Sequence, residues 1–127
     1  MEKKQEEKLL LIVDDNKINR MVIRILLERN GYIIEELDDG ADVISIIKNK
    51  KYKIILLDVE MPIIDGIECT QILRNELNYN GIIIGITSHV DFETYMDCKK
   101  AGMNDVITKP ITEKSIIECL ENNLITK

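Results

Sequence analysis

Five residues of this sequence combine types and spacing that could do chemistry together. They are Asp14 and Asp15 after residues 9–13, Asp58 after 54–57, Thr87 after 82–86, and Lys109 close behind 106–107. Each follows a short apolar run. Clustered carboxylates repel one another, and a divalent cation resolves the conflict. All the candidate ligands are oxygens, which favours magnesium over a soft metal.

A cluster of this kind can carry phosphoryl chemistry. One carboxylate can attack phosphorus to form an acyl phosphate, and a hydroxyl and an amine can bind the remaining phosphoryl oxygens. Taken singly, the residues have plainer explanations. Asp14-Asp15 could cap a helix, Thr87 could do the same, and Lys109 could be a solvated surface lysine.

The apolar runs before these residues predict strands buried on both faces. The runs at 9–13, 54–57 and 82–86 are strong, and those at 32–34 and 106–107 are weaker. Helical patterns alternate with them. The first helix has Ile18, Met21, Val22, Ile25 and Leu26 on one face and ends near Asn30-Gly31. A later helix has Asp91 as its N-cap and Gly102 just past its end, and the last helix has Thr112 as its N-cap.

This alternation predicts an α/β fold with a parallel sheet and helices on both faces. Ligands of such sheets sit beyond the carboxyl ends of the strands. All five chemical residues follow strands, so they are expected to converge on one edge of the sheet.

Bulk properties narrow the class. The 127 residues, 45% of them hydrophobic, fit one domain at 9–127 behind a loose polar arm at 1–8. A net charge of -6 argues against direct nucleic-acid binding. No apolar run could span a membrane, so we expect a cytoplasmic protein. Three cysteines and one histidine show no zinc spacing and predict reduced, packing thiols.

Four segments resemble the receiver domain of two-component and phosphorelay signalling. They are Leu11-Ile12-Val13-Asp14-Asp15-Asn16, Leu57-Asp58-Val59-Glu60-Met61-Pro62-Ile63-Ile64-Asp65-Gly66, Ile86-Thr87-Ser88 and Ala101-Gly102-Met103-Asn104-Asp105-Val106-Ile107-Thr108-Lys109-Pro110. The amino-acid sequence at residues 14–20 and 101–103 is most similar to that of hybrid histidine kinase receivers. The resemblance implies a doubly wound, flavodoxin-like (βα)5 fold with strand order 2-1-3-4-5.

The resemblance also implies roles for the site residues. It implies a Mg2+ requirement, and as donor a sensor histidine kinase or a histidine phosphotransfer protein. Asp58 is implied to be the phosphoacceptor, and Thr87 and Lys109 are implied to bind the phosphoryl group. The implied metal ligands are Asp15 and Asp58 directly, Asp14 mostly through water, and Glu60 through its main-chain carbonyl. The Lys109-Pro110 bond is implied to be cis.

Three positions bear on regulation. Val106 stands where family members usually carry a switch aromatic, so we expect a muted switch on the output surface formed by the helix at Phe92, the strand at Val106 and the last helix. The resemblance places Glu60 and His89 beside the phosphoryl site, where we expect them to act as modulators. They could pair as a lid that slows hydrolysis, which we favour, or either could orient water and speed it.

Two other functions compete with the signalling switch. Asp58-Val59-Glu60 faintly resembles the two-carboxylate motif of aspartyl-nucleophile phosphatases, although Glu60 and the short chain count against that. A phosphorylation-independent interaction module is the other; the acidic cluster argues against it, and Val106 mildly for it. Within the signalling hypothesis, a free-standing regulator and a receiver from a larger protein both stay open.

Overall fold

Five strands form one sheet with helices on both faces. The computed structural model describes residues 8–125, so the predicted arm at 1–8 lies outside the described residues except for Lys8. The elements are β1 (Leu9–Val13), α2 (Lys17–Glu28), β2 (Ile33–Leu37), α3 (Gly40–Ile46), β3 (Ile54–Asp58), α4 (Gly66–Asn75), β4 (Ile82–Thr87), α5 (Phe92–Ala101), β5 (Asp105–Thr108) and α6 (Glu113–Ile125).

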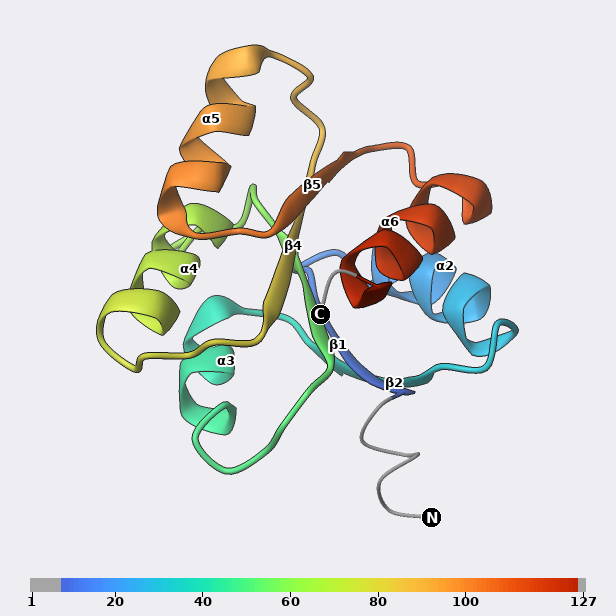
Figure 1. The fold of residues 1–127 in the computed structure, drawn as a ribbon, viewed down its shortest axis with the longest axis horizontal. Coiled ribbons are helices and arrows are strands. Elements are labelled where there is room, and N and C mark those ends of the chain that lie inside the picture. The colour runs from blue at the N-terminus through green and yellow to red at the C-terminus, as the bar shows by residue number, and fades with distance from the viewer. Residues whose placement is uncertain (1–7, 126–127) are drawn as a thin grey trace.

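The sheet has the predicted topology. Its order is β2-β1-β3-β4-β5 and each neighbouring pair is parallel, which confirms the order 2-1-3-4-5. Figure 1 shows α3, α4 and α5 on one side of the sheet and α2 and α6 on the other. Asp91 and Thr112 accept hydrogen bonds from Thr94 and Ser115 N–H groups, as their predicted N-cap roles require.

Alternate residues of the central strands point to opposite faces, so the sheet carries two hydrophobic cores. Leu10 and Ile12 of β1 pack in the core that α2 and α6 cover. Leu11 and Val13 pack in the core that α3, α4 and α5 cover. Because both faces are covered, every residue of the three strong apolar runs except the half-buried Leu9 is buried, which explains why these runs are continuous.

The strand β2 differs from its prediction. The apolar run indicated residues 32–34, whereas the strand runs from Ile33 to Leu37 and includes Glu35 and Glu36. β2 is an edge strand, so its polar side chains reach solvent and neighbouring cations. Glu35 pairs with Lys50, for example. An edge strand therefore does not need a long apolar run.

The apolar face predicted for the first helix points outward. The buried contacts of α2 come instead from Ile23 and Leu27, which lie one turn apart on a neighbouring stripe. The exposed members of the predicted face are Ile18, Met21, Val22 and Ile25, at 61%, 46%, 45% and 54%. The helix was predicted correctly, but its orientation was not specified by this pattern.

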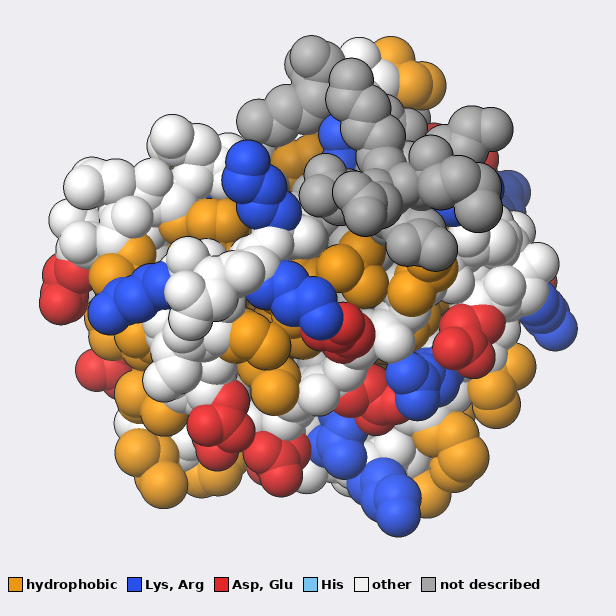
Figure 2. Space-filling model, turned by 90° about the horizontal axis from the view of Figure 1, so that it is seen from below, with side chains coloured by type: hydrophobic (Ala, Val, Ile, Leu, Met, Phe, Trp, Pro, Cys, Tyr) orange, Lys and Arg blue, Asp and Glu red, His pale blue; other side chains and the backbone are white. Residues whose placement is uncertain are grey.

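The surface is chemically mixed on the face drawn in Figure 2. Acidic and basic side chains are interspersed there with apolar ones, and neither sign forms a continuous field over the described part of that face. No helix within residues 8–125 combines the length and the apolar character needed to cross a bilayer. The three cysteines are free; Cys69 and Cys98 are buried, in keeping with a packing role.

Gly66 lets α4 begin directly against the strand that carries Asp58. A Cβ on Gly66 would lie 2.5 Å from the carbonyl oxygen of Asp58 and 2.8 Å from the Cα of Val59. Both distances are well inside van der Waals contact, and the opposing atoms are backbone. The sequence indicated only a turn here; the structure shows a close approach behind Asp58.

We expect Gly66→Ala to lower the free energy of unfolding by roughly 1–3 kcal/mol, the usual range for overpacking, because the backbone at Asp58 must shift. Urea unfolding followed by circular dichroism measures this. Gly40→Ala is the matched control. Gly40 also opens a helix behind an aspartate N-cap, but its Cβ would meet a side-chain methyl of Ile64 at 3.3 Å. Equal losses in both variants would contradict the close-approach explanation.

Candidate functional site

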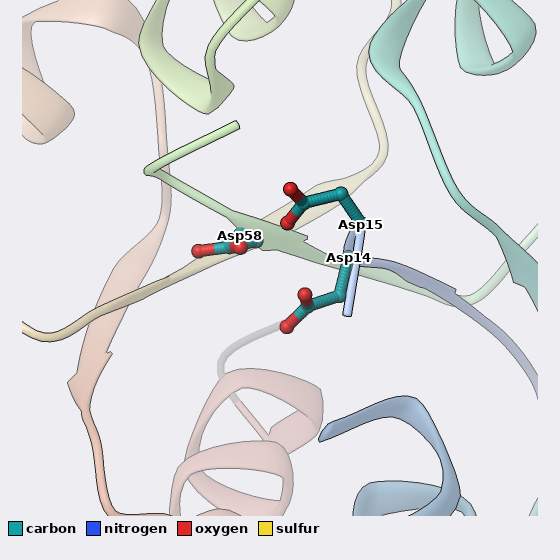
Figure 3. A group of neighbouring side chains, drawn as sticks. All are labelled: Asp14, Asp15 and Asp58. Carbon is teal, nitrogen blue, oxygen red and sulfur yellow. The ribbon is translucent and has the colours of Figure 1, made fainter. Parts of the chain in front are cut away.

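Three aspartates meet at the carboxyl ends of two neighbouring strands. Asp14 and Asp15 follow β1, and Asp58 is the last residue of β3. Each offers a carboxylate oxygen, and these oxygens lie within 4.8 Å of one another. Figure 3 shows the three side chains pointing to the same side of the strand ends. Asp14 and Asp58 are 1% and 2% exposed, whereas Asp15 is exposed.

The environment of Asp58 disfavours its ionised form. Burial, and then the charge of Asp14, raise the pKa of Asp58 to about 7. Lys109 and the main-chain N–H of Glu60, which donates to Oδ1 over 3.2 Å, lower the pKa only in part. The ionised carboxylate therefore needs more positive charge than the protein itself supplies.

Lys109 reaches the acidic residues from the end of β5. Its Nζ lies 3.4 Å from Oδ1 of Asp58 and 3.8 Å from Oδ2 of Asp14. Within the part of the chain that the structure describes, no other cationic side chain lies within 4.0 Å of the three carboxylates. The Lys109-Pro110 bond is cis, as the resemblance implied. The predicted lysine is thus brought to the predicted aspartates.

The carboxylate of Glu60 lies across the loop that follows β4. It accepts hydrogen bonds from the hydroxyl of Thr87 and, at 3.0 Å each, from the N–H and the hydroxyl of Ser88, and it lies 3.3 Å from Nδ1 of His89. Burial raises the pKa of Glu60, but the hydrogen bonds, that of Thr87 foremost, outweigh it and lower the pKa below its ordinary value. Glu60 and His89 are therefore in contact, as predicted.

Thr87 is 1% exposed, and its hydroxyl is already engaged. It donates to Glu60 and accepts a hydrogen bond from the main-chain N–H of His89 at 3.1 Å. The sequence indicated a phosphoryl contact for this hydroxyl and did not reveal the contacts with Glu60 and Ser88. Those contacts depend on the fold of the loop 88–91, which no periodicity describes.

Val106 is half-buried beside a cavity of about 270 Å3. The neighbouring apolar side chains on α5 and the loop before it are open to solvent: Val90 is 82% exposed, Phe92 75% and Tyr95 41%. The residues around the cavity are Thr87, His89, Val90, Asp91, Phe92, Tyr95, Val106 and Thr108. The small valine thus leaves space next to Thr87 open.

Sequence reasoning missed the side chains that hold Asp14. Asn19 Nδ2 lies 3.4 Å from Oδ2 of Asp14, and Arg20 donates to the Asp14 main-chain carbonyl over 2.6 Å. Both residues belong to the segment 14–20, whose sequence contributed to the family resemblance. The signal was present, but polar residues on a helix are ordinarily solvated, so the pattern alone assigned them no role.

The acidic cluster fits a magnesium ion. Its ligands are carboxylate oxygens, two of the carboxylates are buried, and Lys109 balances only part of their charge. The main-chain carbonyl of Glu60, two residues beyond Asp58, is the further ligand that the family resemblance implied and stays a prediction. A second acidic group, Asp38, Asp39 and Asp42, consists of exposed residues only and so lacks the burial of the first.

Comparisons with known proteins converge on one family. The family model described as the response regulator receiver domain matches residues 10–121. The chain is 38% identical over 112 residues to the CAI-1 autoinducer sensor kinase/phosphatase CqsS of Vibrio cholerae, covering 87% of the chain and 16% of that protein. It is 33% identical over 110 residues to the osmosensing histidine protein kinase SLN1 of Saccharomyces cerevisiae, covering 80% and 9%. The chain thus spans less than a fifth of these relatives.

Solved structures agree with the fold. The receiver domain of a Francisella response regulator is 29% identical, with a TM-score of 0.83 over 90% of this chain and 93% of that one. The chemotaxis protein CheY4 of Vibrio cholerae has the same TM-score of 0.83 over 90% and 96%, at 24% identity, and so supports the fold alone.

We expect Asp58→Asn to be more stable than the wild-type protein at about pH 8 in chelator. The pKa of Asp58 is raised, so ionising it destabilises the folded state as pH rises from about 4 to about 7, and the amide removes that effect. One pKa unit corresponds to about 1.4 kcal/mol, so we expect a gain of at least about 1 kcal/mol. Urea unfolding against pH measures it, and the gain should vanish near pH 4.

Asp15→Asn is the control, because it removes the same charge from an exposed position. A gain that is as large and as pH-dependent in Asp15→Asn would show that general charge reduction, not the burial of Asp58, explains the effect.

Proposed function

The chain belongs to the family of response regulator receiver domains, and on this premise we propose that Asp58 is the residue that accepts the phosphoryl group. Receiver domains are phosphoacceptor switches of two-component phosphorelay signalling and not enzymes in the ordinary sense, which favours this proposal over a phosphatase. The observation that carries the proposal is the position of Asp58: buried at a central strand end, facing Asp14, Asp15 and Lys109. We place the domain at residues 9–127.

The transfer requires little of the protein beyond positioning. A carboxylate oxygen of Asp58 forms a bond to phosphorus while the nitrogen–phosphorus bond of a phosphohistidine donor breaks, and the donor imidazole keeps the electron pair. Lys109 Nζ, already 3.4 Å from Asp58, binds one phosphoryl oxygen as a cation. Thr87 binds another through its hydroxyl once that hydroxyl leaves Glu60.

Asp15 and Asp58 are the proposed direct ligands of Mg2+, with Asp14 acting mostly through water and Glu60 through its main-chain carbonyl. When bound, the ion balances the negative charge of the carboxylates and of the incoming phosphoryl group. The protein's own contribution is to hold the three carboxylates within 4.8 Å of one another before the donor arrives. The proposed donor is a sensor histidine kinase or a histidine phosphotransfer protein.

Glu60 and His89 are proposed to act as a lid over the aspartyl phosphate. The Glu60 carboxylate contacts Ser88 and His89 in the loop after β4, and before phosphorylation also Thr87 at the end of that strand. A side chain held in this way obstructs a water molecule in line with the Asp58–phosphorus bond. Hydrolysis of its own aspartyl phosphate is the only turnover we propose for the domain.

The proposed output surface consists of α5, β5 and α6. Val90, Phe92 and Tyr95 expose apolar area there, beside the cavity next to Val106. Val106 is branched and short, so it cannot swing a ring between buried and exposed positions. We propose that the response to phosphorylation arises at Thr87 and the loop leading to α5 and is smaller on β5.

We expect acetyl phosphate with Mg2+ to add one phosphoryl group to the protein and Asp58→Asn to abolish the gain, as measured by intact mass. Lys109→Ala should label more slowly, because a cation that binds the phosphoryl group is lost, yet bind Mg2+ as tightly or more tightly, since a competing charge is gone. Undiminished labelling of Asp58→Asn would refute the assignment, and normal labelling of Lys109→Ala would refute the role of the lysine.

We expect the aspartyl phosphate to decay faster in Glu60→Ala and in His89→Ala, because either change opens the lid. Contacting residues couple by about 0.5–3 kcal/mol, so the double variant should depart at least about twofold from additive effects. Decay of the labelled species is followed by intact mass. Glu60→Ala should have the larger effect, because it also removes the contacts of the carboxylate with Ser88. Slower decay in either single variant would favour water orientation over the lid.

A further inference from the structure

Residues 16–20, which follow Asp14 and Asp15, contact three oxygen atoms of Asp14. The main-chain N–H of Asn16 donates to Oδ1 over 2.8 Å, and Asn19 Nδ2 approaches Oδ2 at 3.4 Å. Arg20 Nη1 donates to the main-chain carbonyl oxygen over 2.6 Å. The start of α2 therefore does more than follow the strand: it fixes the side chain and the backbone of Asp14.

The contact from Arg20 has a consequence beyond Asp14. The carbonyl it binds belongs to the peptide that joins Asp14 to Asp15, and a peptide unit is planar. Holding its oxygen with a charged donor fixes the plane and so the direction in which Asp15 leaves the backbone. Asp15 is exposed, and its side chain makes no hydrogen bond within residues 8–125. Its position therefore depends on this peptide.

Arg20 is itself held in place. Its Nε lies 2.9 Å from Oε1 of Glu36 on β2, and the two side chains are only 15% and 24% exposed. Glu36 binds a second arginine through its other oxygen: Nη1 of Arg24 lies at 2.8 Å. Arg24, one turn further along α2, donates to the carbonyl of Ile34 over 2.7 Å and not to the site. The two arginines share one anchor and differ in the backbone that they hold.

We propose that Arg20 is a positioning residue for the metal site: through the Asp14–Asp15 peptide it sets the direction of the Asp15 carboxylate and thereby the affinity for Mg2+. The proposal rests on the proposed magnesium site. Residues that orient metal ligands commonly change metal affinity by about 10–100-fold when removed. A guanidinium suits the task because its several donors have fixed relative directions and bind Glu36 and the Asp14 carbonyl at once, whereas the donors of an ammonium all lie on one nitrogen.

The test compares Arg20→Ala, Arg20→Lys and Arg24→Ala. The Mg2+ dissociation constant is measured by nuclear magnetic resonance titration, the Asp15 amide shift is recorded in chelator, and stability is measured by urea unfolding. We expect Arg20→Ala to weaken Mg2+ binding by about tenfold or more and to move the Asp15 amide resonance. Arg20→Lys should weaken binding less. Arg24→Ala should lower stability comparably but leave Mg2+ affinity within about twofold of the wild type.

Three outcomes would overturn the inference. Mg2+ affinity of Arg20→Ala within about twofold of the wild type would do so. So would an equal loss of affinity in Arg24→Ala, because affinity would then follow general loosening of α2. If Arg20→Ala does not fold, Arg20→Lys decides, and unchanged affinity there overturns the proposal. Wild-type protein that binds no Mg2+ would instead refute the proposed metal site, on which the inference rests.

Discussion

Repulsion between carboxylates held side by side is the constraint on which the rest of the structure depends. β1 and β3 are neighbours in a parallel sheet, so Asp14 and Asp58 reach the same edge, where burial removes the water that would screen them. The sheet register fixes this arrangement, and Gly66 fixes the backbone behind Asp58. The core thus holds the buried carboxylates close together at a cost, which is relieved when Asp58 is protonated or when positive charge is added.

The two sides of the acidic cluster are held in different ways. On the side of α2, Arg20 and Glu36 lock the backbone of Asp14 with charged, mostly buried contacts. On the side of the loop after β4, the Glu60 carboxylate contacts hydroxyl and imidazole groups that can turn to another acceptor. The first side suits a fixed metal site, and the second suits a part of the molecule that changes during signalling.

The sequence predicted the features that follow from burial and chain order, and missed those that depend on side-chain placement. Strands that are buried on both faces appear in the sequence as continuous apolar runs. Because parallel strands end at the same edge of a sheet, the residues at the ends of β1, β3, β4 and β5 could be predicted to lie at one edge. β2 was predicted only in part, because an edge strand tolerates Glu35 and Glu36. The outward face of α2 was missed because periodicity identifies a stripe without saying what covers it. Arg20 was missed because polar residues on a helix are ordinarily solvated, and nothing in the segment 14–20 indicated that its partner would be a backbone carbonyl.

The hydroxyl of Thr87 has one hydrogen and so can donate to one acceptor at a time. In this structure that acceptor is Glu60. If Asp58 carries a phosphoryl group, as proposed, the Thr87 hydroxyl can donate either to that group or to the Glu60 carboxylate. Donation to the phosphoryl group frees the Glu60 carboxylate, which also contacts Ser88 and His89. Those residues begin the loop that leads to the exposed Phe92 on α5. With a valine at position 106, this exchange of acceptors is a route by which chemistry at Asp58 reaches the surface without any ring having to turn.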